Sequence, residues 1–188
     1  MNESADDKNL RAEVLSSKYL DRRPWFTVRE ECIKMPNGEL IREYFVHEYP
    51  DWVNVIAVTG DKKIVMIRQY RHAHGTTAFE IPAGVCENDG SSLLENAKRE
   101  LMEETGYAGG TWSHFASYSP NPATHTNMAH TFLAMDVELA GEQKLDKTEC
   151  IEVHLLSFDE VMDLLKSGGI IQALMAAVLW KFFYEQKN

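Results

Sequence analysis

The fold is decided by the stretch Arg99-Glu100-Leu101-Met102-Glu103-Glu104-Thr105-Gly106-Tyr107 of this 188-residue chain. Before and within it, apolar residues recur every three or four positions, which is the spacing of an amphipathic helix. The apolar positions are Leu94, Ala97 and Leu101. Gly106 follows them, and glycine at this place commonly ends a helix. We therefore predict a helix over about residues 91–104.

Three carboxylates lie along one edge of this predicted helix. At about 100° per residue, Glu100, Glu103 and Glu104 fall within a sector of about 100°, beside the apolar stripe. Like charges this close repel one another unless a cation lies among them, and oxygen ligands suit a hard ion such as Mg²⁺ or Mn²⁺. The pattern favours a metal site. The alternative is a solvated acidic face on which Lys98 and Arg99 pair locally.

Strand patterns surround the helix. Two stretches of alternating polar and aromatic or β-branched residues flank the turn signal Pro36-Asn37-Gly38 and predict a β-hairpin. Another pair of strands is expected at residues 53–58 and 63–69, around a tight turn. Two later strands are expected at residues 130–137 and 151–157, a helix from the capping box at Ser157 to about Ser167, and a last helix over about 171–185. The sequence predicts one α/β domain preceded by a β extension.

Composition excludes several classes of protein. Hydrophobic residues make up 44% of the chain and charged residues 26%, which is typical of a globular domain and not of a disordered or fibrous one. A net charge of −10 opposes binding to nucleic acid. The apolar run Ala173–Trp180 is too short to cross a bilayer core of about 30 Å. The segment Met1–Lys8 lacks the features of a secretory signal, and three scattered cysteines suit a reducing compartment, so we expect a cytoplasmic protein.

The segment Phe79-Glu80-Ile81-Pro82-Ala83-Gly84, the loop after it and the acidic helix together resemble the Nudix hydrolase family. The family signature is a Gly, five residues, Glu, seven residues, Arg-Glu, an aliphatic residue, any residue, Glu-Glu, any residue, Gly and an aliphatic residue. The second half matches at every fixed position from Arg99 to Gly106, with Tyr107 in the final aliphatic slot.

The first half of the signature departs from the family. Gly84 lies fifteen residues before Arg99, where the pattern has fourteen, so Ser91 stands where the first Glu belongs. One residue is inserted in the intervening loop. In the family this Glu mainly braces the Arg, so we expect an altered loop rather than lost hydrolysis, with Glu87 or Asp89 as a substitute.

The resemblance implies a divalent cofactor, Mg²⁺ with Mn²⁺ as a possible substitute. It implies Glu100 and Glu104 as metal ligands, Glu103 as a nearby ligand or catalytic helper, and the backbone carbonyl of Ala83 as a further ligand. Glu80, just before the Pro-Ala-Gly segment, is another acidic candidate. Such a metal neutralises charge on a diphosphate and activates the attacking water.

Two arginines are candidates for binding phosphate. Arg68 and Arg71 end a predicted strand close in sequence to Glu80, and guanidinium groups suit phosphate oxygens. A similar arginine contacts the phosphates in sugar-nucleotide-cleaving Nudix enzymes, and Arg71 is the better candidate. The alternative is that both pair with some of the 29 acidic residues.

Features after the helix point to a subgroup. Pro122 lies fifteen residues after Tyr107, which is where Nudix enzymes that cleave ADP-ribose and other nucleoside diphosphate sugars carry a proline. In this subgroup an acidic loop near residues 146–153 supplies the general base; we prefer Glu149 and keep Glu152 in reserve. The alternative for either one is an ordinary acidic turn.

The resemblance also implies an architecture: a Nudix-type α/β/α sandwich with a mixed β-sheet. Residues 1–48 would form the N-terminal extension and 49–188 the Nudix domain, and the extension would exchange strands across a homodimer. Trp52 or Trp25, in this N-terminal region, would stack on the base, although an aromatic in a hairpin is more often core.

These observations predict a metal-dependent hydrolase. Its substrate would be a small nucleoside diphosphate sugar, ADP-ribose or an NDP-hexose, cut to a nucleoside monophosphate and a sugar phosphate, with neither nucleic acid nor membrane as a partner. Two alternatives remain: a non-catalytic nucleotide-sensing module disabled by the altered loop, and a Nudix hydrolase of nucleoside triphosphates or dinucleoside polyphosphates.

Overall fold

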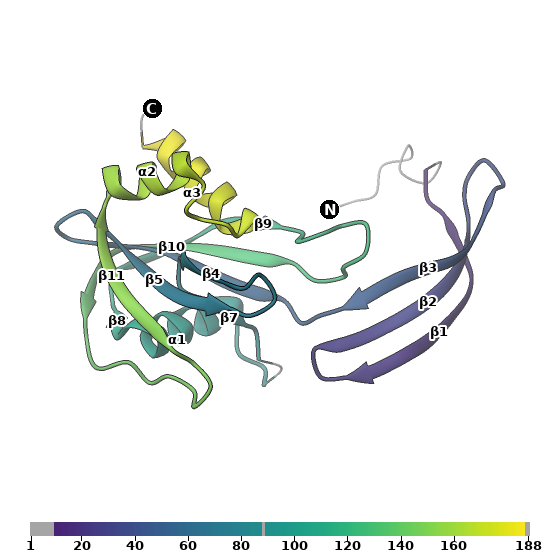
Figure 1. The fold of residues 1–188 in the computed structure, drawn as a ribbon, viewed down its shortest axis with the longest axis horizontal. Coiled ribbons are helices and arrows are strands. Elements are labelled where there is room, and N and C mark those ends of the chain that lie inside the picture. Colours follow the sequence, from purple (N-terminus) through teal and green to yellow (C-terminus); the bar gives the residue numbers. More distant parts are fainter. Residues whose placement is uncertain (1–9, 88, 187–188) are drawn as a thin grey trace. The chain divides into compact units, whose positions relative to one another are not determined.

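The computed structural model describes residues 10–87 and 89–186, and Figure 1 draws them as a ribbon. The segment Met1–Lys8, in which no secretory signal is expected, lies outside the described residues. The chain divides into two compact units. The first runs up to Tyr49 and includes Ser119–Asn127, and the second comprises Pro50–Tyr118 and the chain from Met128 onward. No helix in the described ranges combines the length and the apolar character needed to cross a membrane.

The first unit is an antiparallel sheet of three strands in the order β1-β2-β3. The strands are β1 (Glu13–Arg23), β2 (Phe26–Lys34) and β3 (Leu40–Glu48). The predicted hairpin is the pair β2–β3, and Gly38 in its turn has φ 91°, a conformation that favours glycine. The segment Ser119–Asn127, which the sequence did not assign to this unit, joins it through backbone hydrogen bonds between His47 and both Thr124 (2.7 Å) and Thr126 (3.1 Å).

The second unit contains a mixed sheet of eight strands. The path β11-β5-β4-β10-β8 is extended by β6 on β5, β7 on β4 and β9 on β10. β4 and β10 run parallel and the other neighbours antiparallel. The strands are β4 (Trp52–Thr59), β5 (Lys63–Arg71), β6 (Thr76–Glu80), β7 (Ala83–Val85), β8 (Tyr107–Ala108), β9 (Thr111–Tyr118), β10 (Ala129–Leu139) and β11 (Ile151–Ser157).

Helices cover both faces of this sheet (Figure 1). They are α1 (Leu93–Thr105), α2 (Phe158–Ser167) and α3 (Ala173–Glu185). Because side chains alternate along a strand, β4 contributes to two cores. Val53 and Val55 pack with Leu101 of α1, whereas Ile56 and Val58 belong to the core that includes α2 and α3. The predicted α/β/α sandwich with a mixed sheet is confirmed.

The ends of α1 explain how the acidic helix is positioned. Ser92 and Glu95 form a capping box, in which each side chain accepts a hydrogen bond from the other residue's backbone N–H. Gly106 ends the helix in the left-handed conformation, with φ 76°. A Cβ on Gly106 would lie 2.2 Å from the backbone oxygen of Gly141, so the turn after the helix also needs glycine for space.

Candidate active site

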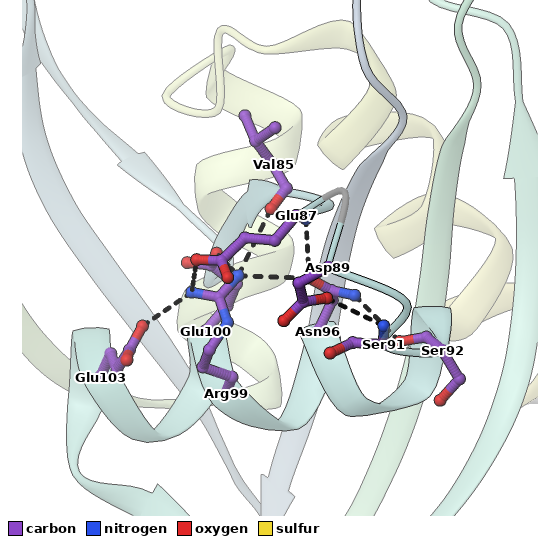
Figure 2. Close-up of polar contacts among 9 residues, drawn as sticks. All are labelled: Val85, Glu87, Asp89, Ser91, Ser92, Asn96, Arg99, Glu100 and Glu103. Carbon is purple, nitrogen blue, oxygen red and sulfur yellow. Dashed lines mark hydrogen bonds and ion pairs between the residues drawn. The ribbon is translucent and has the colours of Figure 1, made fainter.

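Arg99 lies at the centre of the acidic edge of α1 (Figure 2). Its guanidinium pairs with Glu100 at 2.8 Å, with Glu103 at 2.8 Å and with Glu87 at 3.6 Å. It also donates a hydrogen bond of 3.4 Å to the backbone oxygen of Val85. The repulsion between the glutamates is thus offset in part by an arginine, so repulsion alone was an incomplete argument for a metal ion.

The loop before α1 replaces the missing signature Glu. Glu87 reaches Arg99, whereas Asp89 accepts a hydrogen bond of 2.8 Å from the backbone N–H of Ser91, as Figure 2 shows. The loop is fastened to the helix by the buried Asn96, whose Oδ1 accepts a hydrogen bond of 3.0 Å from the backbone N–H of Glu87. Of the two substitutes considered, Glu87 is the one on Arg99, and the expected bracing survives the inserted residue.

Glu104 and Glu100 meet strand β7 at Ala83 and Gly84. Glu104 is only 4% exposed, and its Oε2 accepts a hydrogen bond of 2.9 Å from the backbone N–H of Ala83. Burial raises the pKa of Glu104 to about 8, an effect that this hydrogen bond only partly offsets. Burial also raises the pKa of Glu100, against the opposing effect of Arg99.

Gly84 makes room for the Glu100 carboxylate. A Cβ added to Gly84 would lie 2.0 Å from Glu100 Cδ and 2.2 Å from each of its oxygens. Such a distance is far shorter than any van der Waals contact, so the carboxylate lies directly against the glycine backbone. The expected ligands Ala83, Glu100 and Glu104 are therefore brought together by the β7–α1 contact.

Glu80 and Arg71 form a pair beside this cluster. Glu80 is 1% exposed, and Arg71 Nε donates a hydrogen bond of 2.7 Å to Glu80 Oε1 while Nη2 bonds to Oε2. Glu80 chiefly raises the pKa of Arg71, with smaller effects from Glu104 and Glu149. A buried carboxylate needs such a partner, because an unpaired buried charge is costly.

A cavity of about 460 Å³ opens against these groups. Its walls come from β4 to β7, the start of β10 and the segment that begins α3, and they include Trp52, Arg71, Glu80, Ala83 and Gly84. Its lining is mainly apolar with a few polar groups, which is typical of small-molecule sites. Two predicted substrate-binding residues, Arg71 and Trp52, thus line one cavity with the predicted ligand Ala83.

The remaining predicted residues are not among those that line this cavity. Arg68 pairs with Glu152 at 3.6 Å, and both line a separate pocket between β5 and β11 rather than this cavity. The charge of Glu149 helps to raise the pKa values of Glu100 and Glu104, which places it electrostatically close to them. Trp25, 65% exposed between β1 and β2, and Pro122 belong to the first unit.

The donor set fits a hard divalent cation. All candidate ligands offer oxygen atoms. A cation would offset the energetic cost of burying the negative charges of Glu100 and Glu104. Among residues 10–87 and 89–186, no three His, Cys, Asp or Glu side chains are already grouped as metal ligands. Because Glu100 Oε1 pairs with Arg99 at 2.8 Å, an ion held by Glu100 would share this carboxylate with Arg99.

Sequence reasoning missed Asn54. This residue interrupts the apolar strand β4, lines the cavity and is 4% exposed. Within the described part of the chain its Oδ1 has no hydrogen-bond partner. The available signal was a single polar residue inside the otherwise apolar run from Val53 to Val58.

Comparisons with known proteins define the class. Residues 48–177 match the NUDIX domain model, and with more than half of the chain matched, the chain belongs to the Nudix family and is a Nudix hydrolase. Residues 13–47, almost the whole described part of the N-terminal sheet, match a model described as the nucleoside diphosphate sugar hydrolase N-terminal domain. Divalent metal dependence is general in this class.

Three individual proteins are similar to this chain over most of its length. The chain is 31% identical over 175 residues to an ADP-ribose pyrophosphatase of Bacillus subtilis (strain 168), covering 92% of this chain and 90% of that protein. It is 28% identical over 173 residues to a GDP-mannose pyrophosphatase of Salmonella typhimurium, with 86% of each covered. It is also 32% identical over 139 residues to a methanol dehydrogenase activator of Bacillus methanolicus, covering 73% of this chain and 74% of that protein.

A solved structure, described as an ADP compounds hydrolase, supports the fold. It superimposes with a TM-score of 0.82 over 94% of this chain and 95% of that one, at 22% identity.

Proposed function

We propose that this protein hydrolyses the diphosphate bond of a nucleoside diphosphate sugar, ADP-ribose or an NDP-hexose, to a nucleoside monophosphate and a sugar phosphate. The observation that carries the proposal is the contact of Glu100 and Glu104 with Ala83–Gly84, at the wall of a cavity that also contains Arg71. Relatives named for the cleavage of ADP-ribose and GDP-mannose support this substrate class.

The metal ligands are assigned to Ala83, through its carbonyl, and to Glu100 and Glu104, with Glu103 as a nearby helper. Mg²⁺, with Mn²⁺ as a substitute, would supply charge neutralisation and a more acidic water when bound. Arg99 holds the carboxylates of Glu100 and Glu103 in place through its two 2.8 Å ion pairs.

Arg71 binds the diphosphate in this proposal, and Glu80 orients it. Glu80 was also a candidate metal ligand, but both of its oxygens bond to Arg71. Because Arg71 is 45% exposed, its guanidinium retains a face toward solvent and so can contact an anion as well. Arg68 is not needed for this role.

Glu149 is the preferred general base. Its charge acts on Glu100 and Glu104, whereas Glu152 pairs with Arg68 and His154. The backbone N–H of Asp146 donates a hydrogen bond of 3.0 Å to Glu149 Oε2, which fixes the carboxylate within its turn. A base must reach its water within hydrogen-bond distance, and the effect of the Glu149 charge on Glu100 and Glu104 favours Glu149 over Glu152.

We also propose a homodimer formed through the N-terminal unit, with Trp52 or Trp25 stacking on the base and Pro122 contributing to substrate binding. The support is a set of large apolar side chains exposed on the three-stranded sheet, which a partner would cover. These are Val14, Leu15, Tyr19, Leu20, Phe26, Leu40, Ile41 and Phe45. Light scattering after size-exclusion chromatography tests it, and a monomeric mass at micromolar concentration contradicts it.

A substrate panel tests the activity. The purified protein is incubated with Mg²⁺ and ADP-ribose, GDP-mannose, nucleoside triphosphates or dinucleoside polyphosphates, and the products are identified by chromatography. We expect a monophosphate and a sugar phosphate from the nucleotide sugars. Preferred cleavage of triphosphates or dinucleoside polyphosphates would contradict the substrate class. Binding of these nucleotides without release of any product would favour the sensing module. The observation that supports this module is that Ser91 replaces the first Glu of the signature. Glu87 nevertheless restores an acidic partner to Arg99.

A further inference from the structure

Asn54 is a buried polar residue within the otherwise apolar part of strand β4. It lies between Val53 and Val55, both 0% exposed, on the strand that runs through the middle of the sheet. Its position on β4 puts its side chain on the same face as Ile56 and Val58, the face covered by α2 and α3. In native proteins, nearly every buried polar atom has a partner, so an orphan needs an explanation.

The described protein supplies no donor for the Asn54 amide oxygen. Neither of two polar side chains that share the cavity, Arg71 and Gln172, forms a hydrogen bond with this oxygen. The Arg71 guanidinium bonds to both oxygens of Glu80, and the Gln172 amide oxygen accepts a hydrogen bond of 2.6 Å from the backbone N–H of Leu174 at the start of α3. Water can fill this role in the ligand-free cavity, and a donor on a bound ligand that displaces the water would complete the pairing.

The strand register places Asn54 beside the proposed metal ligand Ala83. Asn54 is paired with Ala83 across β4 and β7. Paired residues on antiparallel strands lie about 5 Å apart between Cα atoms, so Asn54 is one strand spacing from the proposed ligand carbonyl. Phosphate oxygens at neutral pH offer no proton, and the base is separated from the phosphates by the nucleoside ribose. Among the groups of the substrate itself, the donors nearest to the diphosphate are sugar hydroxyls.

We propose that Asn54 Oδ1 accepts a hydrogen bond from a hydroxyl of a sugar attached directly to the diphosphate, and that this contact selects against deoxy sugars. The inference rests on the proposed function. The hydroxyl belongs either to the nucleoside ribose or to the distal sugar. A site built to bond a hydroxyl discriminates against the analogue that lacks it, because the protein group is then left unpaired.

The decisive variant is Asn54→Leu, which keeps the approximate shape and removes the amide. We expect its ligand-free melting temperature to equal or exceed that of the wild type, because an unsatisfied buried oxygen is removed. We expect kcat/KM for ADP-ribose to fall about 10- to 100-fold, the loss of one hydrogen bond to a buried oxygen. Calorimetry with the α,β-methylene analogue of ADP-ribose and Ca²⁺ should show a comparable loss of affinity.

Thr59→Val is the matched control. Thr59 lies at the end of the same strand, and its hydroxyl bonds to Asp61 at 2.6 Å, away from the cavity. This variant should melt at a lower temperature and keep the wild-type kcat/KM and analogue affinity. It separates a loss of stability from a loss of substrate contact.

Deoxy substrates identify the hydroxyl. Wild type should lose kcat/KM on one deoxy analogue, whereas Asn54→Leu should treat that analogue and its parent alike. If this difference between wild type and variant appears with a 2′- or 3′-deoxy nucleoside, the hydroxyl bound by Asn54 belongs to the nucleoside ribose. If it appears with a deoxy distal sugar, the hydroxyl belongs to the distal sugar. Wild-type indifference to every analogue overturns the inference even if the variant fails to fold.

Unchanged analogue affinity and unchanged kcat/KM in Asn54→Leu also overturn it, as does a lower melting temperature with kinetics otherwise intact. Failure of the proposed function has a different signature, namely no product from any nucleotide sugar with the wild type, and the analogue titration still judges Asn54 in that case.

Discussion

Gly84→Ala is a severe test of the site because the structure fixes what the added methyl group meets. The new Cβ would lie 2.0 Å from Glu100 Cδ, whereas ordinary contacts begin at 3.4 Å, so the carboxylate must retreat by about 1.4 Å. A misplacement of about 1 Å costs on the order of 10²-fold in rate. We therefore expect kcat/KM to fall at least about 10²-fold. The melting temperature should change little, because Glu100 is the movable end of a flexible side chain.

The assay is steady-state hydrolysis of ADP-ribose over a Mg²⁺ titration, with thermal unfolding measured on the same preparations. Gly60→Ala is the matched control, since a Cβ at Gly60 would meet nothing within 4 Å. Gly60→Ala should retain wild-type kcat/KM and Mg²⁺ dependence. Wild-type activity and metal dependence in Gly84→Ala would refute the argument that Glu100 acts from its position against this glycine.

Three further predictions probe neighbouring groups. Glu104→Gln should fold normally and lower kcat about 10²- to 10³-fold, since a metal-bound charge is worth several kcal/mol; near-normal turnover would contradict its role as a ligand. Arg71→Ala should lower the free energy of unfolding by about 2–3 kcal/mol, because the buried Glu80 loses its partner while solvent reaches part of the site. The double variant Arg71→Ala/Glu80→Gln should recover at least half of that loss in urea unfolding, and no recovery would refute the pairing argument. Finally, burial raises the pKa of Cys86 to about 11, so at pH 8 only about 0.1% of it is thiolate, and mass spectrometry after iodoacetamide treatment should find the exposed Cys150 alkylated well before Cys86.

Local signals predicted much of the fold. The capping box at Ser157 predicted the start of α2, and the 3.6-residue period predicted α1. β1 was missed because nearly all of its side chains are exposed and give no apolar alternation. β9 was missed for a similar reason, since most of its residues are exposed or half-buried.

The site was predictable only where its geometry is local. Helical periodicity placed Glu100, Glu103 and Glu104 on one edge, and they do surround Arg99 or meet β7. The pair between Arg71 and Glu80 depends on the alignment of β5 with β6, a strand that the sequence did not reveal. Long-range register is set by the whole sheet, so such pairs follow from tertiary structure rather than from spacing.

The bond between Glu87 and Arg99 changes what should be counted as essential in the loop before the helix. The guanidinium needs an acid within reach, and a flexible side chain from a loop of different length satisfies that need as well as one at a fixed distance along the sequence. This loop therefore has to supply a negative charge near the guanidinium, and not a residue at a fixed distance along the sequence. A signature that holds the spacing rigid does not match this chain, although its longer loop brings an acid to the same arginine.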